Sequence, residues 1–207
     1  MIGFIVPARN EEENIKEVIN SIVSTGVKVD DIFVINNASS DNTARIAVSS
    51  GAKVFECKKR GYQATLNEGL KTLISMNYSK FCIIDGDNEI KSDSLKSALS
   101  ASEDFNFIIG KRPYVKRFGE KIVNYFISRR YGVDDLMCGL KLGDLKYYNP
   151  NNRLEYGIDL FDLKKIKEDK ILNIDIRLNS RNDTRLGNVF KVNTLMLILL
   201  VRYFFSL

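Results

Sequence analysis

Residues 80–87 read KFCIIDGD, an apolar run that ends directly in two aspartates separated by one glycine. A short apolar run bounded by turn-forming residues is typical of a buried β-strand. Asp85 and Asp87 therefore follow the carboxyl end of a strand, which is where open α/β sheets bind their ligands. We expect this run to be a strongly apolar strand whose acidic end faces a ligand.

The sequence on both sides of this run repeats the same rhythm of short apolar runs and helical patterns. Further strands are predicted at residues 2–6, 31–35, 52–57, 106–110, 139–142 and 171–176, with helices between most of them. Strands that alternate with helices are typical of βαβ units on a parallel sheet. The sequence therefore predicts an α/β fold with a mostly parallel sheet flanked by helices.

The chain of 207 residues is long enough for one ordinary domain with an appendage, and too short for two large domains. We expect the domain to cover residues 1–190 and an apolar helical tail to cover residues 191–207. A helix over the last sixteen residues would be about 24 Å long, shorter than a hydrocarbon core of about 30 Å. An interfacial helix on a membrane is therefore expected, and packing on the core or in a dimer interface is the alternative.

Composition restricts the chemistry that the chain can perform. Histidine is absent, which excludes histidine-based triads and histidine-rich zinc sites. Cys57, Cys82 and Cys138 form no CxxC pair, so we expect three buried thiols in a reducing compartment. No signal-peptide pattern opens the sequence, and a cytoplasmic location is expected.

Positive charge is concentrated in one segment. The net charge is +5, whereas residues 111–131 alone carry seven Lys or Arg against one Glu. A local excess of this kind indicates an anionic partner, either phosphates, nucleic acid or a lipid surface. The aromatic residues of the segment are expected to be mostly core residues at helical spacing, with lipid contact as the alternative; they are Tyr114, Phe118, Tyr125, Phe126 and Tyr131.

The paired aspartates suggest a metal site. Two carboxylates on an irregular turn, eased by Gly86, can converge on one hard divalent cation such as Mg²⁺ or Mn²⁺, which also binds a diphosphate. Glu89 is close enough in sequence to be a third ligand. A solvated turn is the alternative for an isolated DxD motif.

Polar clusters follow the other predicted strands, so all of them are expected at one edge of the sheet. These clusters read VPARNEE at 6–12, NNASSDNT at 36–43 and GYQATLNEG at 61–69, and a later segment reads DLMCGL at 135–140. With the DGD run, they resemble the family 2 glycosyltransferases, inverting enzymes of the GT-A fold. The motifs of that family read roughly VPxxNEE, DDxSxD, GxxxAxNxG, DxD and D-x-x-C/S-G-F.

The resemblance implies a role for individual residues. A nucleotide-sugar donor would be bound by Pro7, Glu11, Asn37, Ser39, Asp41, Asp85, Gly86 and Arg185, and the metal by Asp85, Asp87 and Glu89. Arg112 would face phosphate. Asp135, or its neighbour Asp134, would lie near the acceptor. These assignments come from the family and not from spacing alone.

One departure from the family bears on the donor. The family usually carries two acids where this chain has Asn36 and Asn37. An asparagine oxygen still accepts a hydrogen bond from uracil N3–H, whereas the carboxylate that best holds the two adjacent donors of guanine is missing. A UDP-sugar is therefore slightly favoured over a GDP-sugar, although Asp41 could compensate.

Two acceptors remain open. A saccharide hydroxyl needs a general base, for which Asp135 is the candidate, whereas a lipid phosphate is already anionic and needs cationic positioning. The basic segment and the apolar tail favour a polyprenyl phosphate, such as dolichyl or undecaprenyl phosphate, at the cytoplasmic face of a membrane. A sugar-phosphate nucleotidyltransferase is disfavoured because the chain lacks a G-x-G-x-R loop. A nucleic-acid partner is not expected, since acidic clusters repel phosphate backbones.

Overall fold

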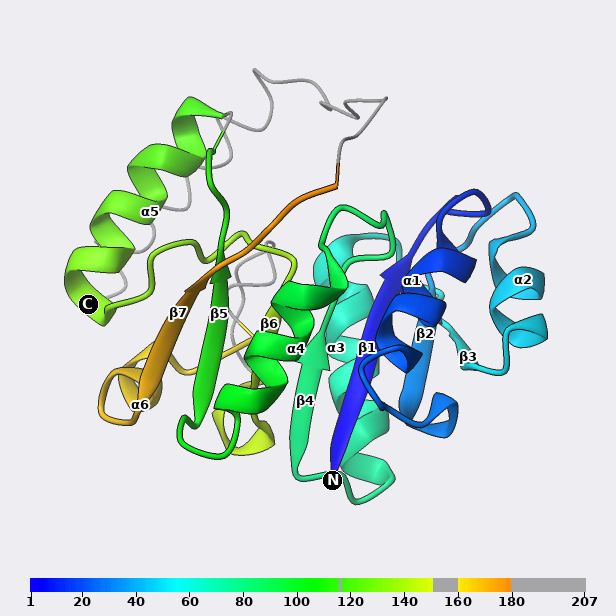
Figure 1. Ribbon diagram of the computed structural model, residues 1–207, viewed down its shortest axis with the longest axis horizontal. Coiled ribbons are helices and arrows are strands. Elements are labelled where there is room, and N and C mark those ends of the chain that lie inside the picture. Colours follow the sequence, from blue (N-terminus) through cyan, green and yellow to red (C-terminus); the bar gives the residue numbers. More distant parts are fainter. Residues whose placement is uncertain (116, 151–159, 180–207) are drawn as a thin grey trace.

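A seven-stranded sheet carries helices on both of its faces in the computed structural model, which describes residues 1–115, 117–150 and 160–179 (Figure 1). The strands are β1 (Ile2–Ala8), β2 (Ile32–Asn36), β3 (Lys53–Glu56), β4 (Lys80–Ile83), β5 (Phe107–Lys111), β6 (Lys141–Asp144) and β7 (Ile171–Asp175). The helices are α1 (Ile15–Val23), α2 (Thr43–Ser49), α3 (Tyr62–Ser75), α4 (Ser92–Ala101), α5 (Phe118–Tyr131) and α6 (Leu163–Lys167), with single 3-10 turns at Val29–Asp31 and Leu145–Tyr147.

The strand order β3-β2-β1-β4-β6-β5-β7 places a topological switch point at the centre of the sheet. β1 pairs in parallel with β2 on one side and with β4 on the other. β6 runs antiparallel to both β4 and β5. The carboxyl ends of the parallel strands therefore meet at one edge, together with the start of β6, and ligands bind at such an edge in open α/β sheets.

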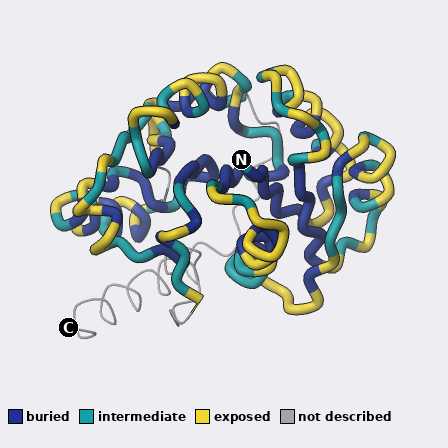
Figure 2. The backbone as a smooth tube through the Cα atoms, turned by 90° about the horizontal axis from the view of Figure 1, so that it is seen from below, coloured by how far each residue is buried: buried dark blue, intermediate teal, exposed yellow. Residues whose placement is uncertain are grey.

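The core has two layers, one on each face of the sheet. Because side chains alternate along a strand, Ile5 of β1 contacts the layer under α3, α5 and α6, whereas Phe4 and Val6 contact the layer under α1, α2 and α4. Figure 2 shows the buried residues along the strands and the exposed ones on the outer sides of the helices. The sheet is thus covered on both faces, and its edges hold the polar groups.

The structure confirms the mostly parallel α/β architecture and the position of the predicted strands. The strand predicted at 139–142 begins two residues later, at Lys141, because the residues before it pack against the end of β4. The three cysteines are buried thiols, as expected. The aromatic residues of the basic segment depart from the prediction, because only Tyr131 is buried and the other four are exposed.

The predicted apolar tail at residues 191–207 lies outside the described residues. Across the three described ranges, the structure contains no helix that combines the length and the apolar character needed to cross a membrane.

Gly69 allows α3 to lie close to the sheet. A Cβ atom built at this position would lie 2.6 Å from Cγ2 of Ile5 and 3.2 Å from Cγ1 of Ile35. A side chain larger than hydrogen must therefore push the helix away from β1 and β2.

We expect Gly69→Val to lower the free energy of unfolding by roughly 1–3 kcal/mol, because it overpacks a filled core. Urea denaturation measures the change. Lys71→Val, at an exposed position of the same helix, controls for the β-branched side chain. Equal midpoints for the two variants would show that α3 does not need this close approach.

Candidate functional site

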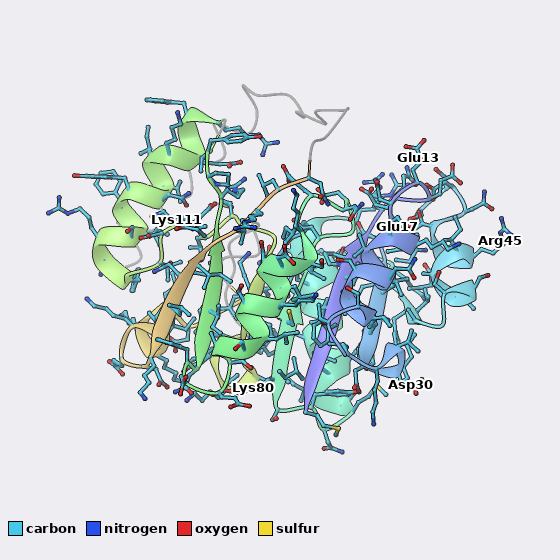
Figure 3. The ribbon with its side chains drawn as sticks, viewed as in Figure 1. Glu13, Glu17, Asp30, Arg45, Lys80 and Lys111 are labelled. Atoms are coloured by element: carbon cyan, nitrogen blue, oxygen red, sulfur yellow. The ribbon has the colours of Figure 1, made fainter. Side chains whose placement is uncertain are left out.

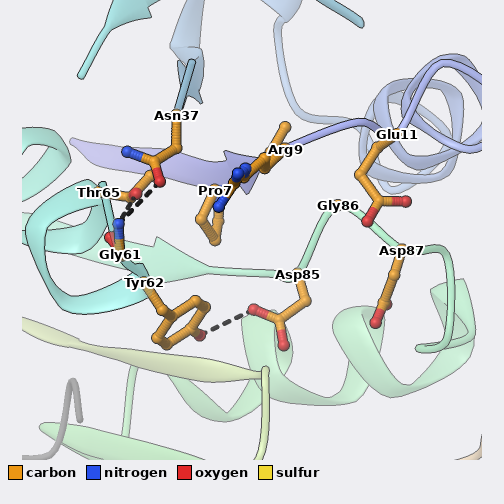
Figure 4. Close-up of a pocket in the computed structure, with 11 residues that line it drawn as sticks. Pro7, Arg9, Glu11, Asn37, Gly61, Tyr62, Thr65, Asp85, Gly86 and Asp87 are labelled. Carbon is orange, nitrogen blue, oxygen red and sulfur yellow. Dashed lines mark hydrogen bonds between the residues drawn. The ribbon is translucent and has the colours of Figure 1, made fainter. Parts of the chain in front are cut away.

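A pocket of about 280 Å³ opens at the carboxyl ends of β1 and β4 (Figure 4). It is lined by Pro7, Ala8, Arg9, Glu11, Asn37, Gly61, Tyr62, Thr65, Asp85, Gly86 and Asp87. Six of the predicted site residues therefore meet at the switch point: Pro7, Glu11, Asn37, Asp85, Gly86 and Asp87. These residues come from three separate sequence motifs, and the parallel sheet brings them together.

The turn that follows β4 packs directly on the backbone of β1. The Ile84 amide donates to the Ile5 carbonyl at 3.1 Å. A Cβ atom at Gly86 would lie 2.9 Å from the Pro7 carbonyl oxygen, a backbone atom that cannot move aside. Glycine at this position lets the two aspartates face the pocket while the turn stays against β1.

Asp85 is held by a tyrosine and carries a perturbed pKa. The Tyr62 hydroxyl donates to Oδ1 of Asp85 at 2.8 Å (Figure 4). Burial raises the pKa of Asp85 to about 6, and the negative charge of Asp87 adds to this shift, while the Tyr62 hydrogen bond and the charge of Lys141 oppose it. The two aspartates therefore form a pair of like charges in a partly desolvated turn.

The segment before β6 closes the other side of Asp85. A Cβ atom at Gly139 would lie 2.3 Å from Oδ2 of Asp85, so no larger residue fits while the carboxylate keeps its place. Lys141 is buried beside this contact, and its ammonium donates to the Cys138 carbonyl. Burial lowers the pKa of Lys141, and the Asp85 carboxylate acts in the opposite direction.

The pair of aspartates suits a divalent cation. Carboxylate oxygens are the ligands that Mg²⁺ and Mn²⁺ prefer, and Mg²⁺ is often held by one or two carboxylates plus the phosphates of a substrate. Asp85 and Asp87 supply two such ligands from one turn at the wall of an open pocket. The raised pKa of Asp85 fits the same role, because a cation would relieve the repulsion that raises it.

Glu89 is not in place as the predicted third ligand. Among the described residues, no three acidic or sulfur side chains are gathered closely enough to hold a metal ion by themselves. Asn88 adopts a positive φ of 55°, which redirects the chain after Asp87. The backbone carbonyl of Glu89 then accepts from the backbone N–H of Asn179 at 2.8 Å, so this part of the turn lies against residues 178–179.

Ser39 and Asp41 join two loops and do not line the pocket, so their contact with a donor stays a prediction. The backbone N–H of Asn10 donates to Ser39 Oγ at 3.1 Å, and the backbone N–H of Glu12 donates to Asp41 Oδ2 at 3.1 Å. Slight burial raises the pKa of Asp41, but hydrogen bonds from Thr43 and from the Glu12 amide outweigh it and the pKa is lowered. These bonds fix the loop after β1 against the loop after β2.

Asn37 lines the pocket and also ties down the loop after β3. Its amide nitrogen donates to the Lys59 carbonyl at 2.8 Å and to the Cys57 carbonyl at 3.4 Å, and its oxygen accepts from the Gly61 amide at 2.9 Å. Both side-chain N–H groups are therefore used inside the protein. One lone pair of the oxygen stays available to a donor such as uracil N3–H.

Asp135 and Arg112 form an ion pair outside the pocket lining, in which Asp135 is buried and Arg112 is half-buried. Arg112 donates from Nε to Oδ2 at 2.7 Å and from Nη2 to Oδ1 at 2.8 Å. The Arg112 backbone amide and the Asn124 side chain donate to the same carboxylate at 3.2 and 3.0 Å. Burial raises the pKa of Asp135, but these bonds and the Arg112 charge outweigh it and the pKa is lowered.

This arrangement weighs against Asp135 as the general base that a hydroxyl acceptor would need. Its four acceptor positions are occupied and its lowered pKa makes it a weak proton acceptor. Its neighbour Asp134 is held by Lys111 at 2.9 Å and by the Ser128 hydroxyl at 2.7 Å. Arg112 uses its Nε and Nη2 atoms in the bonds to Asp135 and Glu120, and Nη1 takes no part in them. The predicted contact between Arg112 and a phosphate therefore stays a prediction. Arg185 lies outside the described residues.

Three residues around the Asp85 carboxylate, Tyr62, Gly139 and Lys141, were not among the sequence-based assignments. Tyr62 belongs to the GYQATLNEG motif and Gly139 to DLMCGL, but their contacts with Asp85 depend on strand order, which no local pattern reports. Lys141 follows the second motif. A lysine in a predicted strand is expected to face solvent. The burial of Lys141 beside the carboxylates is therefore known only from the structure.

Comparison with known families and proteins gives a consistent result. The family model described as Glycosyl transferase family 2 matches residues 4–153. The uncharacterized protein MJ0544 of Methanocaldococcus jannaschii is 29% identical over 161 residues, which cover 67% of this chain and 69% of that protein. The 4,4'-diaponeurosporenoate glycosyltransferase of Staphylococcus aureus is 48% identical over 55 residues, which cover 27% of this chain and 14% of that enzyme.

Solved structures show the same fold. Glucosyl-3-phosphoglycerate synthase from Mycobacterium tuberculosis has a TM-score of 0.75 at 19% identity and covers 98% of this chain and 80% of its own. Mannosyl-3-phosphoglycerate synthase from Rubrobacter xylanophilus has a TM-score of 0.75 at 17% identity, covering 100% of this chain and 74% of its own. The expected GT-A fold is thereby confirmed.

The raised pKa of Asp85 predicts a pH-dependent effect on stability. Because the folded pKa is about 6 and the ordinary value is 3.8, the folded protein loses stability as the pH rises through this window. In metal-free buffer, Asp85→Asn should therefore raise the free energy of unfolding at pH 7.5 by on the order of 1 kcal/mol, with allowance for solvent screening at a half-buried side chain. The gain should largely disappear near pH 4.

Urea denaturation in the presence of a chelator measures both values. Asp104→Asn, which changes an exposed carboxylate outside the pocket, should have no effect at either pH. A destabilised Asp85→Asn at pH 7.5 would contradict the repulsive pair.

Proposed function

The chain belongs to glycosyl transferase family 2 and is a glycosyltransferase, and we propose that it moves a sugar, with inversion, from a UDP-sugar to a polyprenyl phosphate in a reaction that depends on Mg²⁺ or Mn²⁺. The observation that carries the proposal is the aspartate pair at the switch point, Asp85 and Asp87, facing an open pocket. The proposed location is the cytoplasmic face of a membrane.

The donor is proposed to enter the pocket between the ends of β1 and β4. The base would lie beside Pro7 and Asn37, whose free oxygen lone pair matches uracil N3–H. One structural relative supports a uridine donor, because a structure of the mycobacterial synthase contains Mn²⁺, UDP-glucose and phosphoglyceric acid. Its TM-score is 0.72 at 19% identity.

The negative charge of the leaving group gives the acidic pair its proposed role. Asp85 and Asp87 would hold the cation, and a bound cation neutralises the charge that develops on the departing nucleoside diphosphate. Tyr62 and Gly139 hold the Asp85 carboxylate from two sides, so that the pair is oriented before the donor arrives. Arg9, exposed at the pocket wall, adds a positive charge on the route of the diphosphate.

An anionic acceptor agrees better with the site than a sugar hydroxyl. A hydroxyl must lose a proton to a base, and Asp135 is saturated with hydrogen bonds. A phosphate monoester is anionic near neutral pH and needs no base. The two 3-phosphoglycerate synthases that share the fold carry in their names an acceptor with a phosphate group, which supports a phosphate-bearing acceptor and not the choice of the attacking oxygen. The hydroxyl acceptor is the second candidate, and the nucleotidyltransferase alternative is set aside by the family match.

Donor binding is expected to require the metal and to favour uridine. UDP-glucose should raise the melting temperature in the presence of Mn²⁺ and not with a chelator, and GDP-mannose should raise it less. Asp87→Asn should abolish the metal-dependent rise, while Asp104→Asn should retain it. Thermal-shift measurements over a panel of nucleotide sugars test this, and equal shifts with and without Mn²⁺ would contradict the proposal.

Acceptor choice is tested with matched lipids. Radiolabelled sugar should transfer to a short-chain polyprenyl phosphate and not to the corresponding polyprenol, because only the phosphate supplies a nucleophile without a base. Extraction into organic solvent measures the product. Transfer to the polyprenol or to a free saccharide, with none to the phosphate, would favour the hydroxyl acceptor.

A further inference from the structure

The outer face of α5 exposes large aromatic side chains. Phe118 is 70% exposed and Tyr125 57%, Phe126 is exposed as well, and Tyr114 is exposed in the segment before the helix. Other exposed large apolar residues among those described are scattered, such as Val48 on α2 and Ile74 near the end of α3. A concentration of this kind on one surface element of a soluble domain marks an interaction site.

Helical spacing gathers these residues into one stripe. Phe118, Ile122, Tyr125 and Arg129 follow each other at intervals of three or four residues, which places them on one side of the helix. The opposite side packs into the core through Val123, Ile127 and Tyr131. Figure 3 shows side chains of α5 projecting away from the sheet. We call the stripe, with Phe126 and Lys121 beside it, the aromatic face of α5.

Positive charge surrounds the aromatic rings. Lys121 and Arg129 are exposed on this face and Arg130 is half-buried at its end. Glu120 is the sole acidic residue in the sequence of α5, and it is buried in ion pairs with Arg112 at 3.1 Å and Arg117 at 2.7 Å. The exposed face of α5 therefore carries Lys121 and Arg129 and, among the residues of this described helix, no exposed acid.

The aromatic and cationic groups contact each other. The Arg129 guanidinium lies 5.8 Å from the centre of the Tyr125 ring and its Nη1 donates to the Tyr125 hydroxyl at 3.2 Å. The Tyr125 and Phe126 rings meet edge to face at 5.4 Å. The face thus offers aromatic rings between two flanking positive charges.

We propose that the aromatic face of α5 binds the surface of an anionic lipid bilayer. Aromatic rings lie at the depth of lipid headgroups, and Lys and Arg near the surface attract anionic lipids. A second copy of the chain fits this face less well. A two-fold contact through α5 would place Lys121 and Arg129 of both copies against one another.

The position of α5 relates the proposed membrane contact to the pocket. The helix follows β5, whose carboxyl end lies at the same edge of the sheet as the pocket (Figure 1). A bilayer against α5 would hold lipid headgroups beside that edge. The inference deepens the proposed function by specifying which face of the protein meets the membrane, and it is tested without donor, metal or turnover.

The test is cosedimentation of the full chain with phosphatidylcholine vesicles, with and without phosphatidylglycerol. Binding to the anionic vesicles should fall roughly tenfold or more for Phe118→Ser with Tyr125→Ser, and similarly for Lys121→Glu with Arg129→Glu. Val48→Ser with Ile74→Ser and Lys71→Glu with Lys96→Glu are the matched controls at exposed positions elsewhere. The controls should bind like the unchanged protein.

Each other outcome overturns the assignment. Equal binding of all variants would place the anchor in another segment, and no binding of the unchanged protein to anionic vesicles would remove the membrane contact altogether. Light scattering that shows dimers for the unchanged chain and monomers for the α5 variants would identify a second copy as the occupant. Circular dichroism shows that the same variants are folded, and the donor-induced thermal shift is measured separately, so that this failure is distinguished from failure of the proposed function.

Discussion

Asp85 and Asp87 hold two like charges in a half-buried turn at the end of β4, and the pocket is built around that pair. Such a turn is unfavourable by itself, because burial and mutual repulsion both raise the pKa of Asp85. Contacts from three elements nevertheless keep the carboxylate in place: Tyr62 from α3, Gly139 before β6 and the β1 backbone beneath Gly86. The two carboxylates therefore lower the stability of the fold at the position where their negative charges are proposed to hold a cation.

The remaining polar residues at this edge hold the scaffold of the pocket in position. Asp41 and Ser39 join the loops after β1 and β2, and Asn37 joins the pocket to the loop after β3. Arg112 and Asp135 form a separate ion pair outside the pocket lining. The acidic and amide residues of the motifs thus divide between those that line the pocket and those that hold the loops around it.

The sequence predicted the architecture well because alternation of apolar runs and helices follows local chemistry, as in KFCIIDGD at 80–87. It also placed Pro7, Glu11 and Asp87 at one pocket, since parallel strands end at one edge. It could not separate the loop-joining role of Asp41 from ligand binding, because both use the same carboxylate. The contact of Gly139 with Asp85 and the exposure of Phe118 depend on how β6 and α5 pack, which no local pattern encodes.

Electron paramagnetic resonance of Mn²⁺ tests the central claim most directly, because free Mn²⁺ gives a strong signal that protein binding reduces. Titration of the protein with Mn²⁺ in the presence of UDP should show one bound ion, with much weaker binding when UDP is absent. Replacing both Asp85 and Asp87 by Asn should abolish the bound ion while the fold is retained. Unchanged Mn²⁺ binding by that double variant would show that the cation is held elsewhere and would contradict the account.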